Sequence, residues 1–130
     1  MDRILVIHTD SKMRAKLASS LQQAGFEITT ANDGNQGIDK IYKTYPDLII
    51  IAEGLPLING DKACFRIRQI SSSPIIVLGI GQEEVDGIEM LESGADVYLP
   101  SPLDLRELLA RVRSLLRRKR GSSDCSFEEH

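Results

Sequence analysis

Short apolar runs that alternate with helical patterns constrain the fold of this chain more than any other feature of its sequence. Consecutive apolar residues bounded by polar or structure-breaking residues are typical of strands that are buried on both faces. Such runs occur at Ile4–Ile7, Leu48–Ile51, Ile75–Leu78 and Val97–Leu99. A fifth strand is predicted at Phe26–Thr30, where β-branched residues alternate with other types.

Helical patterns separate these predicted strands, with apolar residues recurring at spacings of three and four. The expected helices are one that ends at Gly25, one that ends before Pro46, and three over Gly60–Ile70, Val85–Leu91 and about Pro102–Lys119. Strict alternation of doubly apolar strands with helices predicts an α/β fold, a doubly wound three-layer sandwich around a parallel sheet. In such a fold, sites form beyond the C-terminal ends of the strands.

The composition is that of one soluble globular domain, with 130 residues, 42% apolar and 27% charged. We expect residues 1–120 to form this domain and the polar, aperiodic residues 121–130 to be a disordered tail. No apolar run is long enough to cross a membrane, so we expect no membrane contact and a cytoplasmic location. Cys64 and Cys125 lack CxxC spacing, which gives little support to a disulfide framework or a zinc site.

The net charge of −3 is unevenly distributed along the chain. Residues 1–102 carry 9 basic and 14 acidic side chains, whereas residues 103–120 carry 7 basic and 2 acidic ones. The basic segment ends in the run Arg117–Arg120. Such a run can bind nucleic acid, or it can be the solvated end of a helix, where cations complement the negative end of the helix dipole. We favour the helix end.

Several stretches of the chain resemble the receiver domain of two-component response regulators, most closely receivers of the OmpR/PhoB type. The resemblance covers about residues 2–119, in order and at the right spacing. It is carried by the segments Arg3–Ile7, Pro46–Ile51, Leu55–Gly60, Ser73–Leu78, Gly94–Pro100 and Leu105–Arg113. The resemblance implies a flavodoxin-like (βα)5 sandwich with the strand order 2-1-3-4-5.

Receivers of this family carry a phosphoacceptor carboxylate after the third strand and two acids that help to hold Mg²⁺ after the first. A hydroxyl after the fourth strand and a lysine after the fifth bind the phosphoryl oxygens. The resemblance puts the acidic pair on His8 and Thr9, the phosphoacceptor on Ala52, the hydroxyl on Gly79 and the lysine on Ser101. None of these residues matches the family pattern. We therefore expect a degenerate phosphorylation site with no catalytic residue, no metal and no cofactor.

Neighbouring residues offer few substitutes for the missing groups. Asp10 is the one acid left near the end of the first strand, and a single carboxylate is a poor Mg²⁺ site. Glu53 follows Ala52, and because successive strand residues point to opposite sides, we expect Glu53 to be a solvated surface acid unless a bulge intervenes. His8 is expected to fill the emptied pocket.

Tyr98 matches the position of an aromatic switch residue in the receivers that the chain resembles. In those proteins the ring moves as the hydroxyl after the fourth strand responds to phosphate. Since Gly79 offers no hydroxyl, we expect Tyr98 to be static. The peptide bond between Ser101 and Pro102 matches a position that is usually cis in receivers, and we expect it to be cis here.

The resemblance also implies a dimer or partner surface made of the fourth helix, the fifth strand and the fifth helix. Its expected residues are Gly87, Leu91, Asp96, Val97, Glu107, Arg111 and Arg118. Gly87 and Val97 replace a basic and an acidic residue of the family pattern, so we expect altered, more apolar contacts. A monomer with a solvated charged face is the alternative. The basic run resembles the point at which such receivers lead into a DNA-binding domain of a longer transcriptional regulator; a stand-alone adaptor is the other possibility.

These observations predict an atypical receiver domain that acts in signalling through protein–protein contacts and not through an aspartyl phosphate. The alternative is a sensor that binds a small molecule in the vacated pocket, which would need space lined by His8, Ala52, Gly79 and Ser101. An enzyme has little support, because the sequence contains no nucleophile–base pair, metal-ligand set or phosphate-binding loop.

Overall fold

A parallel five-stranded sheet with the order β2-β1-β3-β4-β5 organises the computed structural model, which describes residues 2–55, 60–79, 91–92 and 94–128. The strands are β1 (Arg3–Ile7), β2 (Glu27–Ala31), β3 (Leu48–Ala52), β4 (Ile75–Leu78) and β5 (Val97–Leu99). Every residue of the central strands β1, β3 and β4 is buried apart from Arg3, as their continuous apolar runs predict. The predicted fold class and strand order are confirmed.

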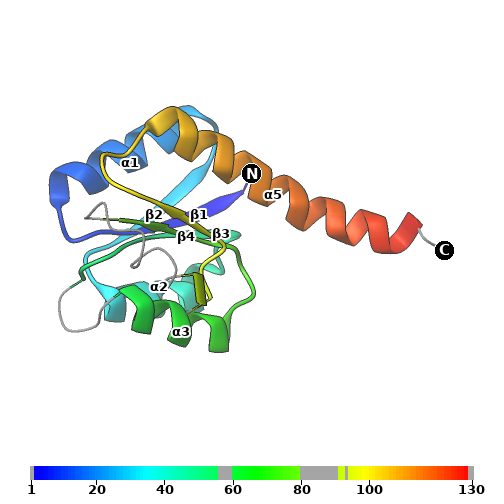
Figure 1. The fold of residues 1–130 in the computed structure, drawn as a ribbon, viewed down its shortest axis with the longest axis horizontal. Coiled ribbons are helices and arrows are strands. Elements are labelled where there is room, and N and C mark those ends of the chain that lie inside the picture. Colours follow the sequence, from blue (N-terminus) through cyan, green and yellow to red (C-terminus); the bar gives the residue numbers. More distant parts are fainter. Residues whose placement is uncertain (1, 56–59, 80–90, 93, 129–130) are drawn as a thin grey trace.

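Helices cover both faces of the sheet, which gives three layers (Figure 1). The helices α1 (Ser11–Gln23) and α5 (Leu105–Glu128) lie on one face, and α2 (Gly34–Thr44) and α3 (Gly60–Ile70) lie on the other. The central strands contribute alternate side chains to two separate apolar clusters. One cluster joins the sheet to α1 and α5, and the other joins it to α2 and α3. Among the described residues, no helix is both long and apolar enough to span a bilayer.

Local signals explain where several helices begin and end. Asp10 caps α1 by accepting bonds from the amides of Lys12 and Met13, and Asp33 caps α2 in a similar way. Gly25 follows α1 with a φ of 99°, as expected for a glycine that ends a helix. Tyr45 takes the left-handed conformation at the end of α2 and is 75% exposed, so it does not continue the buried face of that helix.

Two helical predictions differ from the structure or fall outside it. The predicted helix over Val85–Leu91 lies almost wholly outside the described residues, of which Leu91 and Glu92 are helical. Helix α5 extends to Glu128, beyond the end that was expected near Lys119. Its last turns project away from the sheet (Figure 1). Residues in these turns lack the apolar periodicity of the packed part, and that is why sequence pattern did not predict them as helix.

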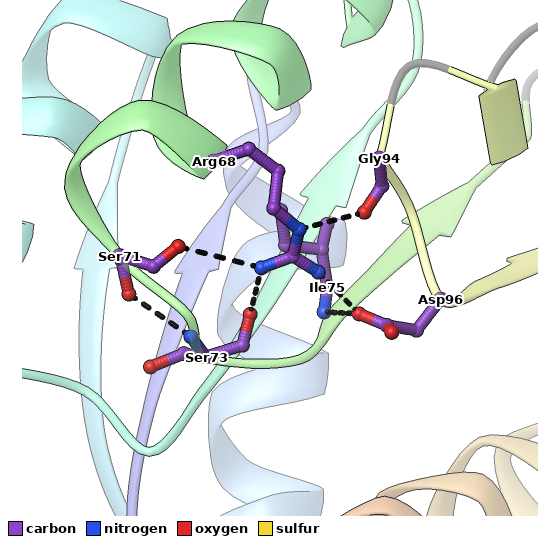
Figure 2. Close-up of polar contacts among 6 residues, drawn as sticks. All are labelled: Arg68, Ser71, Ser73, Ile75, Gly94 and Asp96. Carbon is purple, nitrogen blue, oxygen red and sulfur yellow. Dashed lines mark hydrogen bonds and ion pairs between the residues drawn. The ribbon is translucent and has the colours of Figure 1, made fainter.

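Arg68 joins three elements at the N-terminal edge of β4 and β5 (Figure 2). Its Nε donates to the carbonyl of Gly94 at 3.0 Å, and its Nη1 donates to the carbonyls of Ser73 at 2.5 Å and Ser71 at 3.5 Å. Its Nη2 forms an ion pair with Asp96, whose carboxylate also accepts the amide of Ile75 at 2.8 Å.

The Arg68 cluster also restricts its neighbours. A Cβ at Gly94 would lie 2.6 Å from Cγ of Arg68, and the φ of Gly94 is 118°, so only glycine fits there. An open cavity of about 540 Å³ lies beside the cluster, lined by Arg68, Gln69, Ile70, Ser71, Ser72 and Asp96. Because each nitrogen of the guanidinium has a partner within the chain, Arg68 ties α3 to the starts of β4 and β5.

Candidate functional site

The C-terminal edge of the sheet brings together the five positions that sequence analysis singled out. His8 and Thr9 follow β1, Ala52 ends β3, Gly79 follows β4, and Ser101 follows β5 after one intervening residue. Since β1, β3, β4 and β5 are parallel neighbours, their C-terminal ends share one edge. This is the edge at which doubly wound folds place their sites.

Ala52 occupies the centre of this edge. It is 2% exposed, and its pairing with Leu78 places it between β1 and β4. Its methyl group packs in the same apolar cluster as Ile51. Ala52 pairs with Leu78 in the same register as the residues before it, so the β3 ladder continues to its last residue. A buried methyl group supplies neither a nucleophile nor a metal ligand.

Glu53 differs from the solvated acid that alternation predicted. It is half-buried, and the hydroxyl of Tyr98 donates a hydrogen bond to its Oε1 at 3.1 Å. Its amide donates to the carbonyl of Leu78 at 2.8 Å, which holds the start of this loop against β4. The prediction did not foresee that β5 brings the hydroxyl of Tyr98 to this carboxylate. Glu53 is thus the carboxylate that the fold holds beside the end of β3.

The ring of Tyr98 lies directly against Gly79. A Cβ added to Gly79 would lie 2.2 Å from Oη of Tyr98 and 2.6 Å from its Cζ, far inside normal contact distance. The ring packs against the apolar cluster that contains Ile51 and Ala52. The amide of Gly79 also donates to the carbonyl of Leu99 at 2.8 Å. The lack of a side chain at Gly79 is therefore what admits the ring to this edge of the sheet.

His8 and Arg14 form a second polar group at the end of β1. Nδ1 of His8 accepts the amide of Asp10 at 3.1 Å, and Nη1 of Arg14 donates to the carbonyls of His8 at 2.7 Å and Thr9 at 3.4 Å. Burial lowers the pKa of His8 below its ordinary 6.5; Asp10 raises it by a smaller amount, and Arg14 lowers it further. The imidazole is therefore held neutral and acts as a hydrogen-bond acceptor. No spacing in the sequence indicated that Arg14 would bind the carbonyls of His8 and Thr9.

Asp10, the acid that follows β1, fixes the backbone at the start of α1. Oδ1 of Asp10 accepts the amides of Lys12 at 2.9 Å and Met13 at 3.4 Å, which is its role as the cap of α1. Within the described ranges, no group of three or more His, Cys, Asp or Glu side chains is placed to hold a metal ion. Ser101 is half-buried, and its peptide bond to Pro102 is cis, as expected.

The expected partner surface is described in part, since Gly87 lies outside the described residues. Leu91 is 47% exposed, whereas Val97 is half-buried against the apolar cluster of α5. Asp96 forms an ion pair with Arg68 and accepts the backbone N–H of Ile75, both within the chain. Glu107 and Arg111 face each other across one turn of α5 at 3.9 Å, and Arg118 is exposed.

The response regulator receiver domain matches this chain over residues 4–113. The chain belongs to this family. Response regulator ArlR from several strains of Staphylococcus aureus is 39% identical over 119 residues, which are 92% of this chain and 54% of the relative. This receiver domain thus spans about half the length of the curated relatives that it matches.

Solved receiver structures agree with this assignment. A two-component response regulator from Clostridium difficile has a TM-score of 0.88 and 33% identity, covering 92% of this chain and 98% of that one. The receiver domain of the Francisella response regulator 1452 has a TM-score of 0.87 and 29% identity, with coverages of 92% and 99%. The likeness therefore extends over nearly the whole of each receiver.

Proposed function

We propose that this receiver domain signals through protein–protein contacts that do not depend on an aspartyl phosphate. The observation that carries the proposal is Ala52 at the end of β3, where the family resemblance puts the phosphoacceptor. Its buried methyl group cannot attack phosphorus. His8, Thr9, Gly79 and Ser101 supply neither the acidic pair, nor the hydroxyl after β4, nor the lysine of the family pattern.

The position of Tyr98 supports the same proposal. In receivers that the chain resembles, this aromatic side chain moves when the hydroxyl after the fourth strand binds phosphate. Here the ring fills the space beside Gly79, and Glu53 accepts a hydrogen bond from its hydroxyl. These contacts support a ring that stays in one place, whereas a phosphate signal would have to move it.

We propose the surface made by Leu91, β5 and α5 as the one through which the domain contacts a second copy or a partner protein. Leu91 gives this surface an exposed apolar residue, and Glu107, Arg111 and Arg118 give it a charged rim. The relatives named response regulator ArlR are about twice as long as the matched segment. We propose that the domain works, as part of a transcriptional regulator, together with a DNA-binding domain.

A small-molecule sensor is the competing function for this edge of the sheet. It requires open space among His8, Ala52, Gly79 and Ser101. Tyr98 takes up the space beside Gly79, and Ala52 is covered by its neighbours. These two contacts favour signalling by protein contact over binding of a ligand.

Sedimentation of the purified chain with Mg²⁺, with and without beryllofluoride, tests the proposal. We expect the same molar mass in both conditions, because beryllofluoride needs a carboxylate at the phosphoacceptor position. We also expect no addition of a phosphoryl group in intact-mass spectra after incubation with acetyl phosphate. A receiver with a complete site, treated in parallel, is the positive control for both reagents.

Two results would contradict the proposal. One is a change of mass on addition of beryllofluoride. The other is a hydroxylamine-labile phosphoryl adduct on Glu53 or Asp10 that disappears in the Glu53→Gln or Asp10→Asn variant. A saturable shift of the amide resonances of His8 and Gly79 by a metabolite would instead favour the sensor.

A further inference from the structure

The two helices that cover one face of the sheet carry a large excess of cations. Helix α1 contains Lys12, Arg14 and Lys16 and no acidic residue. As far as Lys119, α5 contains one acid, Glu107, against the basic residues Arg106, Arg111, Arg113, Arg117, Arg118 and Lys119. Both helices pack on the same apolar cluster and lie on the same side of the sheet in Figure 1. One face is therefore basic although the whole chain has a net charge of −3.

Three arginines form an unpaired row on α5. Arg106, Arg113 and Arg117 are exposed, and their spacings of seven and four residues put them on one side of the helix. Two other cations of α5 have partners: Arg111 with Glu107 at 3.9 Å, and Lys119 with Asp47 at 3.7 Å. Within the described part of the chain, the guanidinium groups of the three row residues have no hydrogen bond or ion pair.

The exposed apolar side chains lie elsewhere. Among the residues whose exposure is described, the exposed large hydrophobic side chains are Tyr42, Tyr45, Phe65, Ile70 and Leu91, and none belongs to α1 or to α5 as far as Lys119. Protein interfaces have an apolar, aromatic core, and helices that bind membranes insert apolar side chains. Single strands stack their bases on aromatic rings. A face with cations and without such side chains suits none of these partners.

We propose that the face made by α1 and α5 binds the phosphate backbone of duplex nucleic acid, with Arg106, Arg113 and Arg117 as its central contacts. A duplex presents about one charge per 1.7 Å and needs only cations opposite it. Arginine suits phosphate because its planar fork donates two parallel bonds. Adjacent row residues Arg113 and Arg117 stand about one helical turn apart and can contact separate phosphates. This binding does not read sequence and is independent of the protein contacts proposed above.

Fluorescence anisotropy with a labelled duplex of arbitrary sequence tests this proposal. We expect the logarithm of the binding constant to fall linearly with the logarithm of salt concentration between about 50 and 200 mM. The double variant Arg113→Gln, Arg117→Gln should reduce the slope by about 2, because each phosphate that is no longer neutralised removes about 0.9. The matched control is Lys43→Gln, Arg66→Gln, which removes two exposed cations from α2 and α3 and should leave the slope unchanged.

Three outcomes would overturn the proposal. The first is no anisotropy change at about 50 mM salt, and the second is an equal reduction of slope in the control variant. The third is that poly-glutamate competes as well as unlabelled duplex does when the two are compared at equal concentration of charge. That result would identify an acidic protein as the partner. Thermal unfolding of both double variants establishes that each is folded, so that a smaller slope reports the absence of the two arginines.

Discussion

The hydroxyl of Tyr98 donates to Oε1 of Glu53 at 3.1 Å across the C-terminal edge of the sheet. The bond joins β5 to the loop that begins directly after Ala52, and it spans 45 positions of sequence. It is the direct side-chain link between the residue at the aromatic switch position and the carboxylate nearest to the end of β3. Its contribution to stability can be measured by removing the hydroxyl alone.

Replacing Tyr98 by Phe removes the hydroxyl and keeps the ring. We expect the free energy of unfolding to fall by about 1 kcal/mol, because a part-buried hydrogen bond to a carboxylate contributes roughly that amount. Urea titration followed by circular dichroism measures the change. Tyr45→Phe is the matched control, since Tyr45 is 75% exposed and its loss of a hydroxyl should be neutral. Equal effects at the two positions would refute a specific role for the bond.

Replacing Gly79 by Ala should cost about 1–3 kcal/mol, because the new methyl group overlaps the ring of Tyr98. The cost should nearly vanish in a Tyr98→Ala background, where no ring remains to be displaced. A double-mutant cycle measured by urea unfolding gives the coupling between the two positions. Purely additive effects would show that the ring of Tyr98 and a methyl group at position 79 do not compete for the same space.

Removing Arg68 by an Arg68→Ala change should reduce the free energy of unfolding by about 2–4 kcal/mol. The change leaves the carbonyls of Ser73 and Gly94 without their donor and the carboxylate of Asp96 without its cation. Arg66→Ala is the control, an exposed arginine of the same helix that should cost less than about 0.5 kcal/mol. Similar losses for both variants in calorimetry would contradict the importance of the cluster.

Acidification should destabilise the domain through His8. Its pKa is lowered by burial in the folded state, so the unfolded chain, with a pKa near 6.5, binds the proton first as the pH falls. The stability is full above about pH 6.5 and declines below it until the folded pKa is reached. The His8→Asn variant should lose this decline, because the asparagine side chain does not titrate. Its oxygen can still accept the backbone N–H of Asp10, so the hydrogen bond is kept.

The control for this pH dependence is His130→Asn, a change at the last residue of the sequence. It should leave the decline between about pH 7 and 5 as it is in the parent chain. If chemical denaturation at these pH values gave the same decline for parent and His8→Asn, the titration would belong to other groups.

Sequence pattern predicted the fold well because a buried face of a strand or helix requires apolar residues at a regular local spacing. The continuous apolar runs of β3 and β4 identified central strands, and Gly25 identified a helix end, since each property is set by a few adjacent residues. The strand order came from the family resemblance. The five positions at the sheet edge were likewise expected together, because the C-terminal ends of parallel strands meet.

The contacts within the edge could not be predicted in the same way. The hydrogen bond of Glu53 depends on Tyr98, which lies 45 positions away, and the place of Tyr98 depends on the absent side chain of Gly79. Arg68 and Asp96 lie 28 positions apart, and no local pattern indicates that they pair. Such contacts are set by the tertiary arrangement, which periodicity does not encode.

The anchoring of β5 limits how this domain can transmit a stimulus. Asp96, just before the strand, is tied to Arg68 and Ile75, and Leu99, its last residue, accepts the amide of Gly79. A strand only three residues long and fastened at both ends has no freedom to slide in register. We therefore expect an incoming binding event to be relayed by tilting or shifting whole helices over a stationary sheet.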